Sequence, residues 1–143
     1  MSHPRTILCF DFGLRRIGVA IGQDVTGSAS PLGTIRNNDD GVDHSHIDRL
    51  VAEWHPTLLV VGMPAHADGS ATALQPAIDA FIEGLARYDL PVETVDERYT
   101  SVEAERVLKK ARAEGRIGRI SKAMIDSAAA VVIAERYLAT SRS

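Results

Sequence analysis

The chain has 143 residues, of which 45% are hydrophobic and 24% are charged, and its formal net charge is −3. This composition is typical of an ordinary globular protein, and the length suits one domain, so we expect residues 1–143 to fold as a single unit. No apolar run reaches the roughly 20 residues of a membrane span, and no signal-peptide pattern precedes the first apolar segment. We therefore expect a cytoplasmic protein without a membrane partner. Cys9 is the only cysteine, which excludes an intramolecular disulfide.

The charge is unevenly distributed. Between residues 103 and 122 the chain has seven basic and three acidic residues, so this segment is locally about +4 and the remainder about −7. The basic residues are Arg106, Lys109, Lys110, Arg112, Arg116, Arg119 and Lys122. A basic segment on an acidic body suits a nucleic-acid backbone, although such stretches are more often a solvated surface.

The first predicted elements are strands. The stretch from Ile7 to Gly22 is typical of a hairpin, two apolar strands joined by a short turn with glycine and arginine. Residues 25–31 have turn chemistry, and 32–35 are expected to add a third antiparallel strand. Residues 37–41 are predicted to be a polar loop.

Helices and parallel strands then alternate. Ile47, Leu50, Val51 and Trp54 form one apolar helical face, and Pro56 ends that helix. We interpret His44 and His46, which stand two apart, as surface residues. The further predicted elements are a buried parallel strand at 58–61, a helix over 74–85, a strand at 92–95, a helix opened by the capping box of Thr100 and Glu103, and a last helix capped by Ser121. This order predicts an α/β fold, a mixed sheet with helices on both faces.

Three acidic residues occupy positions where the local pattern favours apolar or neutral ones. Asp11 lies in the first apolar strand, Glu97 follows the last strand, and Asp126 lies in the final helix beside its apolar stripe. Binding sites in open sheets collect at the carboxyl ends of the parallel strands. Asp11 and Glu97 could meet there if their strands are neighbours, and a helix crossing that end could bring Asp126.

Carboxylates that converge on one point repel one another unless cations lie between them. Oxygen ligands without a Cys or His pair favour Mg²⁺ or Mn²⁺ over zinc, and two such ions can support phosphodiester hydrolysis. Other interpretations stay open on the residues alone. Asp11 could form a buried ion pair with Arg16, Glu97 could pair with Arg98 on the surface, and Asp126 could face solvent.

Four motifs resemble one known family. Residues 11–20 (DFGLRRIGVA), 62–64 (GMP) with 68–69 (DG), 96–104 (DERYTSVEA), and Lys122 with 126–130 (DSAAA) resemble the YqgF family of RNase H-like, RuvC-related nucleases. The resemblance covers nearly the whole chain in the family's order. It implies a three-layer RNase H-like fold with a five-stranded mixed sheet, three strands antiparallel and two parallel. One departure is His66, where the family pattern has an asparagine.

The resemblance also implies a function. Family members are described as nucleases that process the 5′ end of pre-16S ribosomal RNA, and an older description is Holliday junction resolvase. It implies that Asp11, Glu97 and Asp126 are catalytic and bind two Mg²⁺ or Mn²⁺ ions. Arg16, Arg98 and Lys122 match basic motif positions and could contact phosphates, as could Arg106, Lys109, Lys110, Arg116 and Arg119.

Alternative functions follow from the same residues. The expected partner is precursor rRNA or a ribosomal particle, bound by a monomer or homodimer, in ribosome biogenesis. A resolvase would instead act on branched DNA as a symmetric dimer. A third possibility is an RNA-binding assembly factor without catalysis. An actin-like ATPase shares the Asp-x-Gly turn, but that architecture needs two such domains.

Overall fold

The computed structural model describes residues 5–38, 41–64, 72–96, 106, 108–110, 112–115 and 122–141, with only the backbone for 122–124, 126, 140 and 141. Its strands are β1 (Thr6–Asp11), β2 (Arg16–Gln23), β3 (Ser28–Asn38), β4 (Gly41–Val42), β5 (Leu58–Met63) and β6 (Val92–Asp96). Its helices are α1 (His44–Trp54), α2 (Gln75–Gly84) with the 3₁₀ turn η1 (Leu85–Tyr88), and α4 (Lys122–Ser141).

The six strands form one mixed sheet in the order β4-β3-β2-β1-β5-β6. Strands β1 to β4 pair antiparallel, and β5 and β6 pair parallel to β1 and β5. The five predicted strands are confirmed, and β4 is an additional edge strand of two residues. It lies where the sequence predicted the end of a polar loop, because two residues are too few to show an alternating pattern.

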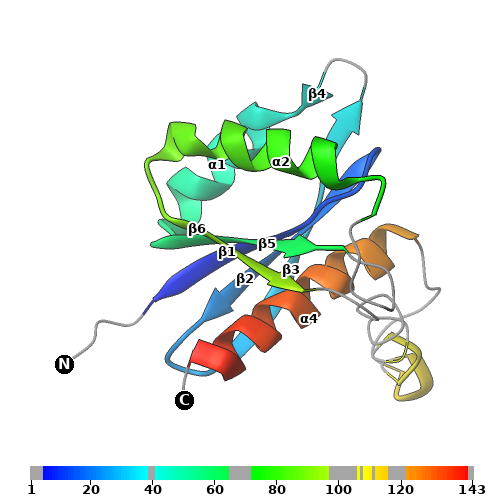
Figure 1. The fold of residues 1–143 in the computed structure, drawn as a ribbon. Helices are drawn as coiled ribbons and strands as arrows, with labels where there is room; N and C mark the ends of the chain where they lie inside the picture. The colour runs from blue at the N-terminus through cyan, green and yellow to red at the C-terminus, as the bar shows by residue number, and fades with distance from the viewer. Residues whose placement is uncertain are drawn as a thin grey trace.

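Helices cover both faces of the sheet, as the element order predicted (Figure 1). On one face, α1 and α2 pack Ile47, Leu50, Ile78 and Phe81 against alternate residues of the central strands. On the other face, α4 packs Ile133, Ala134 and Leu138 against a second set. In β1 the even-numbered residues Leu8 and Phe10 face α1 and α2, whereas Ile7 and Cys9 face α4. This alternation fixes which face each later residue of β1 presents.

Strand β3 is longer than predicted because it contains a bulge. Its register with β2 shifts between Val19 and Ala20, where Gly33 and Pro31 are the respective partners. Gly33 has a φ of 98°, a value that favours glycine. Proline lacks an amide hydrogen and is accepted in sheets at bulges and edges. The turn-like composition of residues 28–31 therefore reflects an irregular strand.

The predicted basic helix is present where the structure describes it. Residues 106, 108–110, 112 and 113 are helical. Leu108 is half-buried against Ala128 and Ala129 of α4. This contact attaches the basic segment to the amino-terminal half of α4. Within the described ranges, no helix is long and apolar enough to cross a membrane.

Candidate active site

Asp11 is the last residue of β1 and lies at the carboxyl edge of the sheet. Its side chain shares the α4 face with Ile7 and Cys9, since side chains alternate along a strand. It is half-buried, whereas the four residues before it are fully buried. The sequence suggested an acid in the middle of a core strand. The structure instead places this acid where the core ends and solvent begins, which lowers the cost of its charge.

Two glycines flank Asp11 on the neighbouring strands. It is in register with Gly18 of β2 and with Gly62 of β5. Residues in register point to the same face of a sheet, so neither neighbour fills the space beside the carboxylate with a side chain. The sheet is therefore open on both sides of Asp11. Gly13 has a different role, because a Cβ there would lie 2.5 Å from the Arg16 carbonyl oxygen in the hairpin turn.

The last strand ends at the same edge but is not adjacent to β1. Strand β5 lies between them, and Asp11, Gly62 and Val95 form one row across the three strands. Residues in such a row are about 5 Å apart per strand, so Asp11 and Val95 are separated by about 10 Å of backbone. The condition under which Asp11 and Glu97 were expected to meet, neighbouring strands, is therefore not met. Glu97 itself lies outside the described residues.

Helix α4 brings position 126 to the level of Asp11. The helix runs antiparallel to β1, with Tyr137 near the strand's start, where Arg5 Nη1 donates to Tyr137 Oη at 3.3 Å (Figure 1). Ile133 packs on Ile7 and Cys9, and position 126 is two turns further on, about 10 Å along the helix. Along the strand, Asp11 lies two residues, or about 7 Å, beyond Cys9 and four residues, or about 13 Å, beyond Ile7. Position 126 thus sits on the turn of α4 that reaches the carboxyl edge.

Two side chains hold α4 against the sheet, one next to this position and one nearer the end of the helix. Ser127 is buried, and its hydroxyl accepts a hydrogen bond from the Gly33 amide at 3.2 Å and donates one to the Val19 carbonyl at 3.4 Å. It thereby bridges the backbone groups that the bulge has separated. Arg136 donates from Nη1 to the Asp96 carbonyl at 3.2 Å, which ties α4 to the end of β6. These contacts fix the strand end that precedes Glu97 and the helix turn that carries position 126.

The chemistry of the donor set fits a hard divalent cation. Within the described residues no group of three His, Cys, Asp or Glu side chains could hold a metal ion, and Asp11 is the one predicted ligand whose side chain is described. Cys9 does not compete, since burial raises the pKa of its thiol and it stays protonated. A carboxylate in an open sheet edge between two glycines leaves room for a hydrated ion such as Mg²⁺ or Mn²⁺. Metal binding here remains a prediction.

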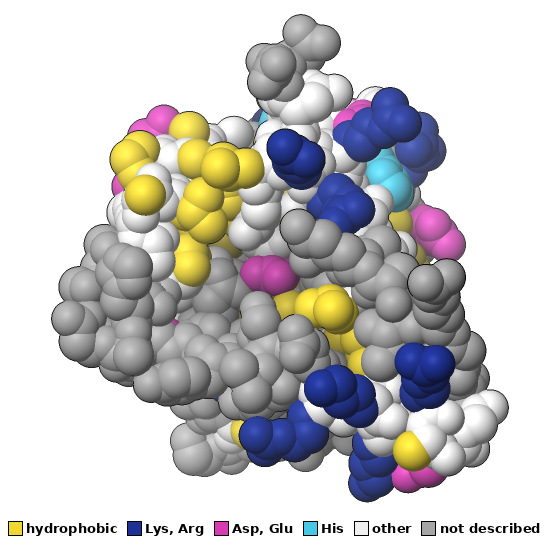
Figure 2. Space-filling model, turned by 90° about the vertical axis from the view of Figure 1, so that its right-hand side faces the viewer, with side chains coloured by type: hydrophobic (Ala, Val, Ile, Leu, Met, Phe, Trp, Pro, Cys, Tyr) yellow, Lys and Arg dark blue, Asp and Glu magenta, His cyan; other side chains and the backbone are white. Residues whose placement is uncertain are grey.

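Basic side chains surround this edge. Figure 2 looks directly at it and shows an acidic side chain near the centre, with Lys and Arg side chains gathered above and below. Arg106, Lys109, Lys110 and Arg112 are exposed on the helical segment that Leu108 attaches to α4. A polyanion that approached this face would meet positive charge above and below its centre.

Arg16 lies close to Asp11 in the register. It is the first residue of β2 and is half-buried, two positions from Gly18 on the same face. A long side chain reaches such a diagonal neighbour in an antiparallel pair. Both predicted roles, an ion pair with Asp11 and a phosphate contact, are compatible with this position.

The remaining predicted site residues stay predictions. Arg98, Arg116, Arg119 and His66 lie outside the described residues, and Lys122 begins α4 with only its backbone described. Sequence reasoning missed Arg15, Arg36 and Asn37, which line a hollow at the same edge. No pattern in the sequence connects residues about 20 positions apart, and only the hairpin register brings them together.

Comparisons with known proteins agree with this geometry. A family model described as RuvX, Holliday junction resolvase, matches residues 5–140. A protein of Nitrosococcus oceani is 45% identical over 139 residues, which cover 96% of this chain and 88% of that protein. A protein of Paraburkholderia xenovorans is 41% identical over 138 residues, which cover 96% of this chain and 90% of that protein. Both relatives are named "Putative pre-16S rRNA nuclease".

Solved structures show the same fold at low sequence identity. The RuvC protein of Thermus thermophilus, in complex with a Holliday junction substrate, aligns with a TM-score of 0.61 at 13% identity over 96% of each chain. The Fowlpox virus resolvase, in complex with Holliday junction DNA, aligns with a TM-score of 0.62 at 12% identity over 96% of this chain and 99% of that chain. The predicted RNase H-like, RuvC-related fold is thereby confirmed.

Proposed function

The chain belongs to the RuvX family, described as Holliday junction resolvases, and on that basis we propose that it is a nuclease that hydrolyses phosphodiester bonds of structured RNA. Its substrate is pre-16S rRNA, the RNA for which its relatives at 45% and 41% identity are named, and it acts on the 5′ region. The observation that carries the proposal is the position of Asp11, at the end of the central strand, with glycines on both sides and position 126 of α4 at its level.

The acidic residues form the catalytic centre of this proposal. Two divalent cations, Mg²⁺ or Mn²⁺, would be held by the carboxylate oxygens of Asp11, Glu97 and Asp126. Bound there, such ions supply Lewis-acid stabilisation of the phosphate and lower the pKa of the attacking water. The protein's part is to keep the carboxylates in place: β1 fixes Asp11, and the contacts of Ser127 and Arg136 fix the elements that carry the other two.

The basic residues bind the substrate backbone. Arg106, Lys109 and Lys110 present positive charge beside α4, and Arg16 lies next to Asp11. Arg98, Lys122, Arg116 and Arg119 complete the predicted set. Each phosphate contact releases counterions, so RNA binding should weaken steeply as salt is raised.

A second candidate is Holliday junction resolution. The description of the matching family favours it. A resolvase makes paired cuts and should be a symmetric dimer. Cleavage of a synthetic four-way DNA junction in preference to precursor rRNA, by a protein that is dimeric in light scattering, would support this function over RNA processing.

The test is cleavage of precursor rRNA by matched charge variants. Asp11→Asn removes one negative charge at the carboxyl edge. Asp89→Asn removes one at the opposite edge, where Asp89 is the C-cap of η1 with a φ of 53° that asparagine also adopts. We expect Asp11→Asn to lose cleavage and Asp89→Asn to retain it. Salt-sensitive RNA binding by both variants, with no cleavage by the wild type in Mg²⁺ or Mn²⁺, would instead identify a non-catalytic assembly factor.

A further inference from the structure

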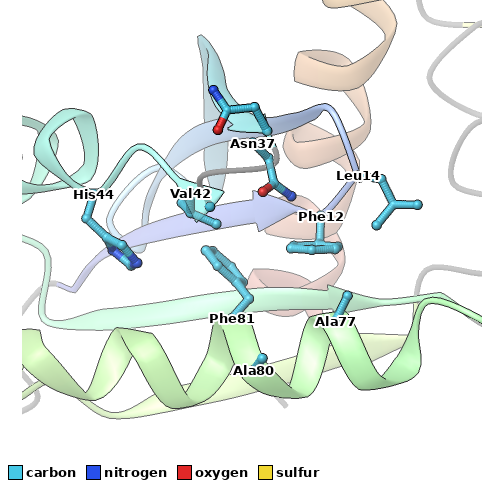
Figure 3. Close-up of a pocket in the computed structure, with 10 residues that line it drawn as sticks. Phe12, Leu14, Asn37, Val42, His44, Ala77, Ala80 and Phe81 are labelled. Carbon is cyan, nitrogen blue, oxygen red and sulfur yellow. The ribbon is translucent and has the colours of Figure 1, made fainter.

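A cavity lies on the face of the sheet opposite to Asp11, beside the same edge. It has a volume of about 500 Å³, is open to solvent, and its lining includes Phe12, Leu14, Asn37, His44, Ala80 and Phe81. Figure 3 shows the labelled lining side chains, which come from the β1–β2 turn, β3, β4, α1 and α2, with Leu14 at the side. Phe12 directly follows Asp11 and points to the other face, so the cavity and the carboxylate share one strand end. Its volume is in the range of small-molecule sites.

The walls of this cavity are apolar, with a few polar groups. Phe12 and Phe81 pack with ring centroids 5.4 Å apart, and Ala77 and Ala80 leave the α2 wall without bulk. Leu14 is 63% exposed at the rim, an unusual position for a large apolar side chain. His44 Nδ1 is buried and, among the described residues, has no hydrogen-bond partner. His44 is half-buried, and helix spacing did not reveal that the end of α2 lies close to its ring.

A second hollow of about 500 Å³ adjoins the cavity. Arg15 and Arg36 line it together with Leu14, Asn37 and Asn38, and the last three residues also line the cavity. Arg15 and Arg36 are exposed, and within the described parts of the chain neither has a carboxylate partner.

The wall between the two hollows is held in place by Asn37. Its Nδ2 donates to the Gly13 carbonyl at 2.7 Å, and its amide donates to the Arg15 carbonyl at 3.0 Å. The β1–β2 turn is thus fixed to β3, so both hollows keep their shape without a ligand. A preformed site loses less free energy to ordering when it binds.

We propose that the two hollows together form a subsite for one unpaired nucleotide of the substrate, with its base in the apolar cavity and an adjoining phosphate on Arg15 and Arg36. Apolar and aromatic walls with a few hydrogen-bonding groups suit a splayed base, and paired arginines suit a phosphate. The proposal rests on the proposed nuclease function, because the subsite shares its strand end with Asp11. It assigns the enzyme a preference for substrates with an unpaired nucleotide close to the cleaved bond.

The first test varies the RNA and leaves the protein unchanged. The probe is a fluorescent RNA hairpin with a single-stranded overhang, compared with versions that carry one abasic nucleotide at each overhang position and with a fully paired hairpin. Binding is measured by anisotropy with Ca²⁺ in place of Mg²⁺, and a gel checks that the probe stays intact. We expect one abasic position to weaken binding about tenfold, the effect of removing one stacked base. Equal affinity for all the probes would overturn the proposal.

The second test fills the cavity. Ala80 is exposed on α2, so Ala80→Trp adds bulk at the cavity wall without disturbing the core. The matched control is Ala52→Trp, at an exposed position of α1 that lines neither hollow. We expect Ala80→Trp to weaken binding of the intact overhang about tenfold and to remove the effect of the abasic nucleotide. An equal loss on the fully paired hairpin would show that the cavity does not receive a base.

The third test concerns the phosphate. Arg15→Gln with Arg36→Gln should lower the slope of log affinity against log salt by about 0.7 for the phosphate contact. Arg49→Gln, an exposed arginine of α1, should leave the slope unchanged. An unchanged slope in the double variant refutes the phosphate assignment. If the abasic effect is present but cleavage does not depend on Asp11, the nuclease proposal fails and the subsite stands. If cleavage depends on Asp11 without an abasic effect, the subsite fails alone.

Discussion

Removing the Ser127 hydroxyl tests how α4 is fixed to the sheet. In Ser127→Ala, the Val19 carbonyl and the Gly33 amide lose the group that bridges them at 3.4 Å and 3.2 Å. Val19 is 0% exposed, so water cannot easily replace the hydroxyl at its carbonyl, whereas Gly33 is exposed and its amide can bind water. One buried group left unsatisfied costs about 1–3 kcal/mol, and the exposed amide should add little.

The assay is urea unfolding of Ser127→Ala and wild type, followed by circular dichroism. We expect Ser127→Ala to lose about 1–3 kcal/mol of unfolding free energy, with no change in the slope of that free energy against urea concentration. Its melting temperature should be lower by about 3–10 °C. Thr26→Ala is the control, because its hydroxyl also bridges neighbouring groups, the Gln23 carbonyl and the amide and hydroxyl of Ser28, but is exposed. Its cost should stay within about 0.5 kcal/mol. If Ser127→Ala is as stable as Thr26→Ala, the hydroxyl does not bridge the bulge.

Three further predictions concern packing, pH and substrate binding. Gly22→Ala should lower the free energy of urea unfolding by about 1–3 kcal/mol, because the new Cβ would lie 2.8 Å from Ile7 Cγ1 and 3.3 Å from Leu138 Cδ1. Gly84→Ala, whose Cβ would lie 3.5 Å from His44, should be neutral or stabilising. Equal effects of the two substitutions would contradict the close contact at Gly22. The pKa values of Tyr88 and Tyr137 are raised in the folded protein, chiefly by burial. A hydrogen bond to Asp48 raises that of Tyr88 further, and one to Glu93 raises that of Tyr137. The stability that these phenols contribute is present below about pH 10, their pKa in the unfolded chain, and is lost as the pH rises through the raised pKa values. The melting temperature of the wild type should therefore fall more steeply above about pH 10 than that of Tyr88→Phe. Parallel curves of melting temperature against pH would count against this prediction. Leu108→Asp should detach the basic helix from Ala128 and Ala129. The salt dependence of RNA binding should then weaken by about 0.7–0.9 in slope for each phosphate that the helix no longer binds, while Leu108→Met should keep the wild-type slope. An unchanged slope in Leu108→Asp would show that this helix does not bind the RNA backbone.

Much of the fold was predictable because its elements repeat a pattern. The face of Ile47, Leu50 and Trp54 extends over about two helical turns, and the strand at 58–61 is apolar throughout, so periodicity identified both. Strand β4 has two residues and no period. The first half of β3 contains Pro31 and lies at a bulge whose hydrogen bonds come from Ser127, more than 90 residues away. Tertiary contacts, which local patterns do not encode, determine such segments.

The candidate site was predictable in part for the same reason. Asp11 stood out because a charge interrupts an apolar strand, and its glycine neighbours became visible only through the register of β2 and β5. The separation of β1 from β6 by β5 depends on strand order, which the sequence of elements left open. Arg15 and Arg36 are ordinary surface residues in the sequence and become a pair only in the folded hairpin. The roles of Glu97 and Asp126 stay predictions.

Cleavage of precursor 16S rRNA in Mg²⁺ tests the central claim most directly, with wild type, Asp11→Asn and Asp89→Asn compared at equal concentration. Loss of several kcal/mol of transition-state stabilisation should slow Asp11→Asn by about 100-fold or more, with Asp89→Asn close to wild type. Circular dichroism should show all three folded. Cleavage by a folded Asp11→Asn variant at the wild-type rate would contradict the assignment of this carboxylate to the catalytic centre.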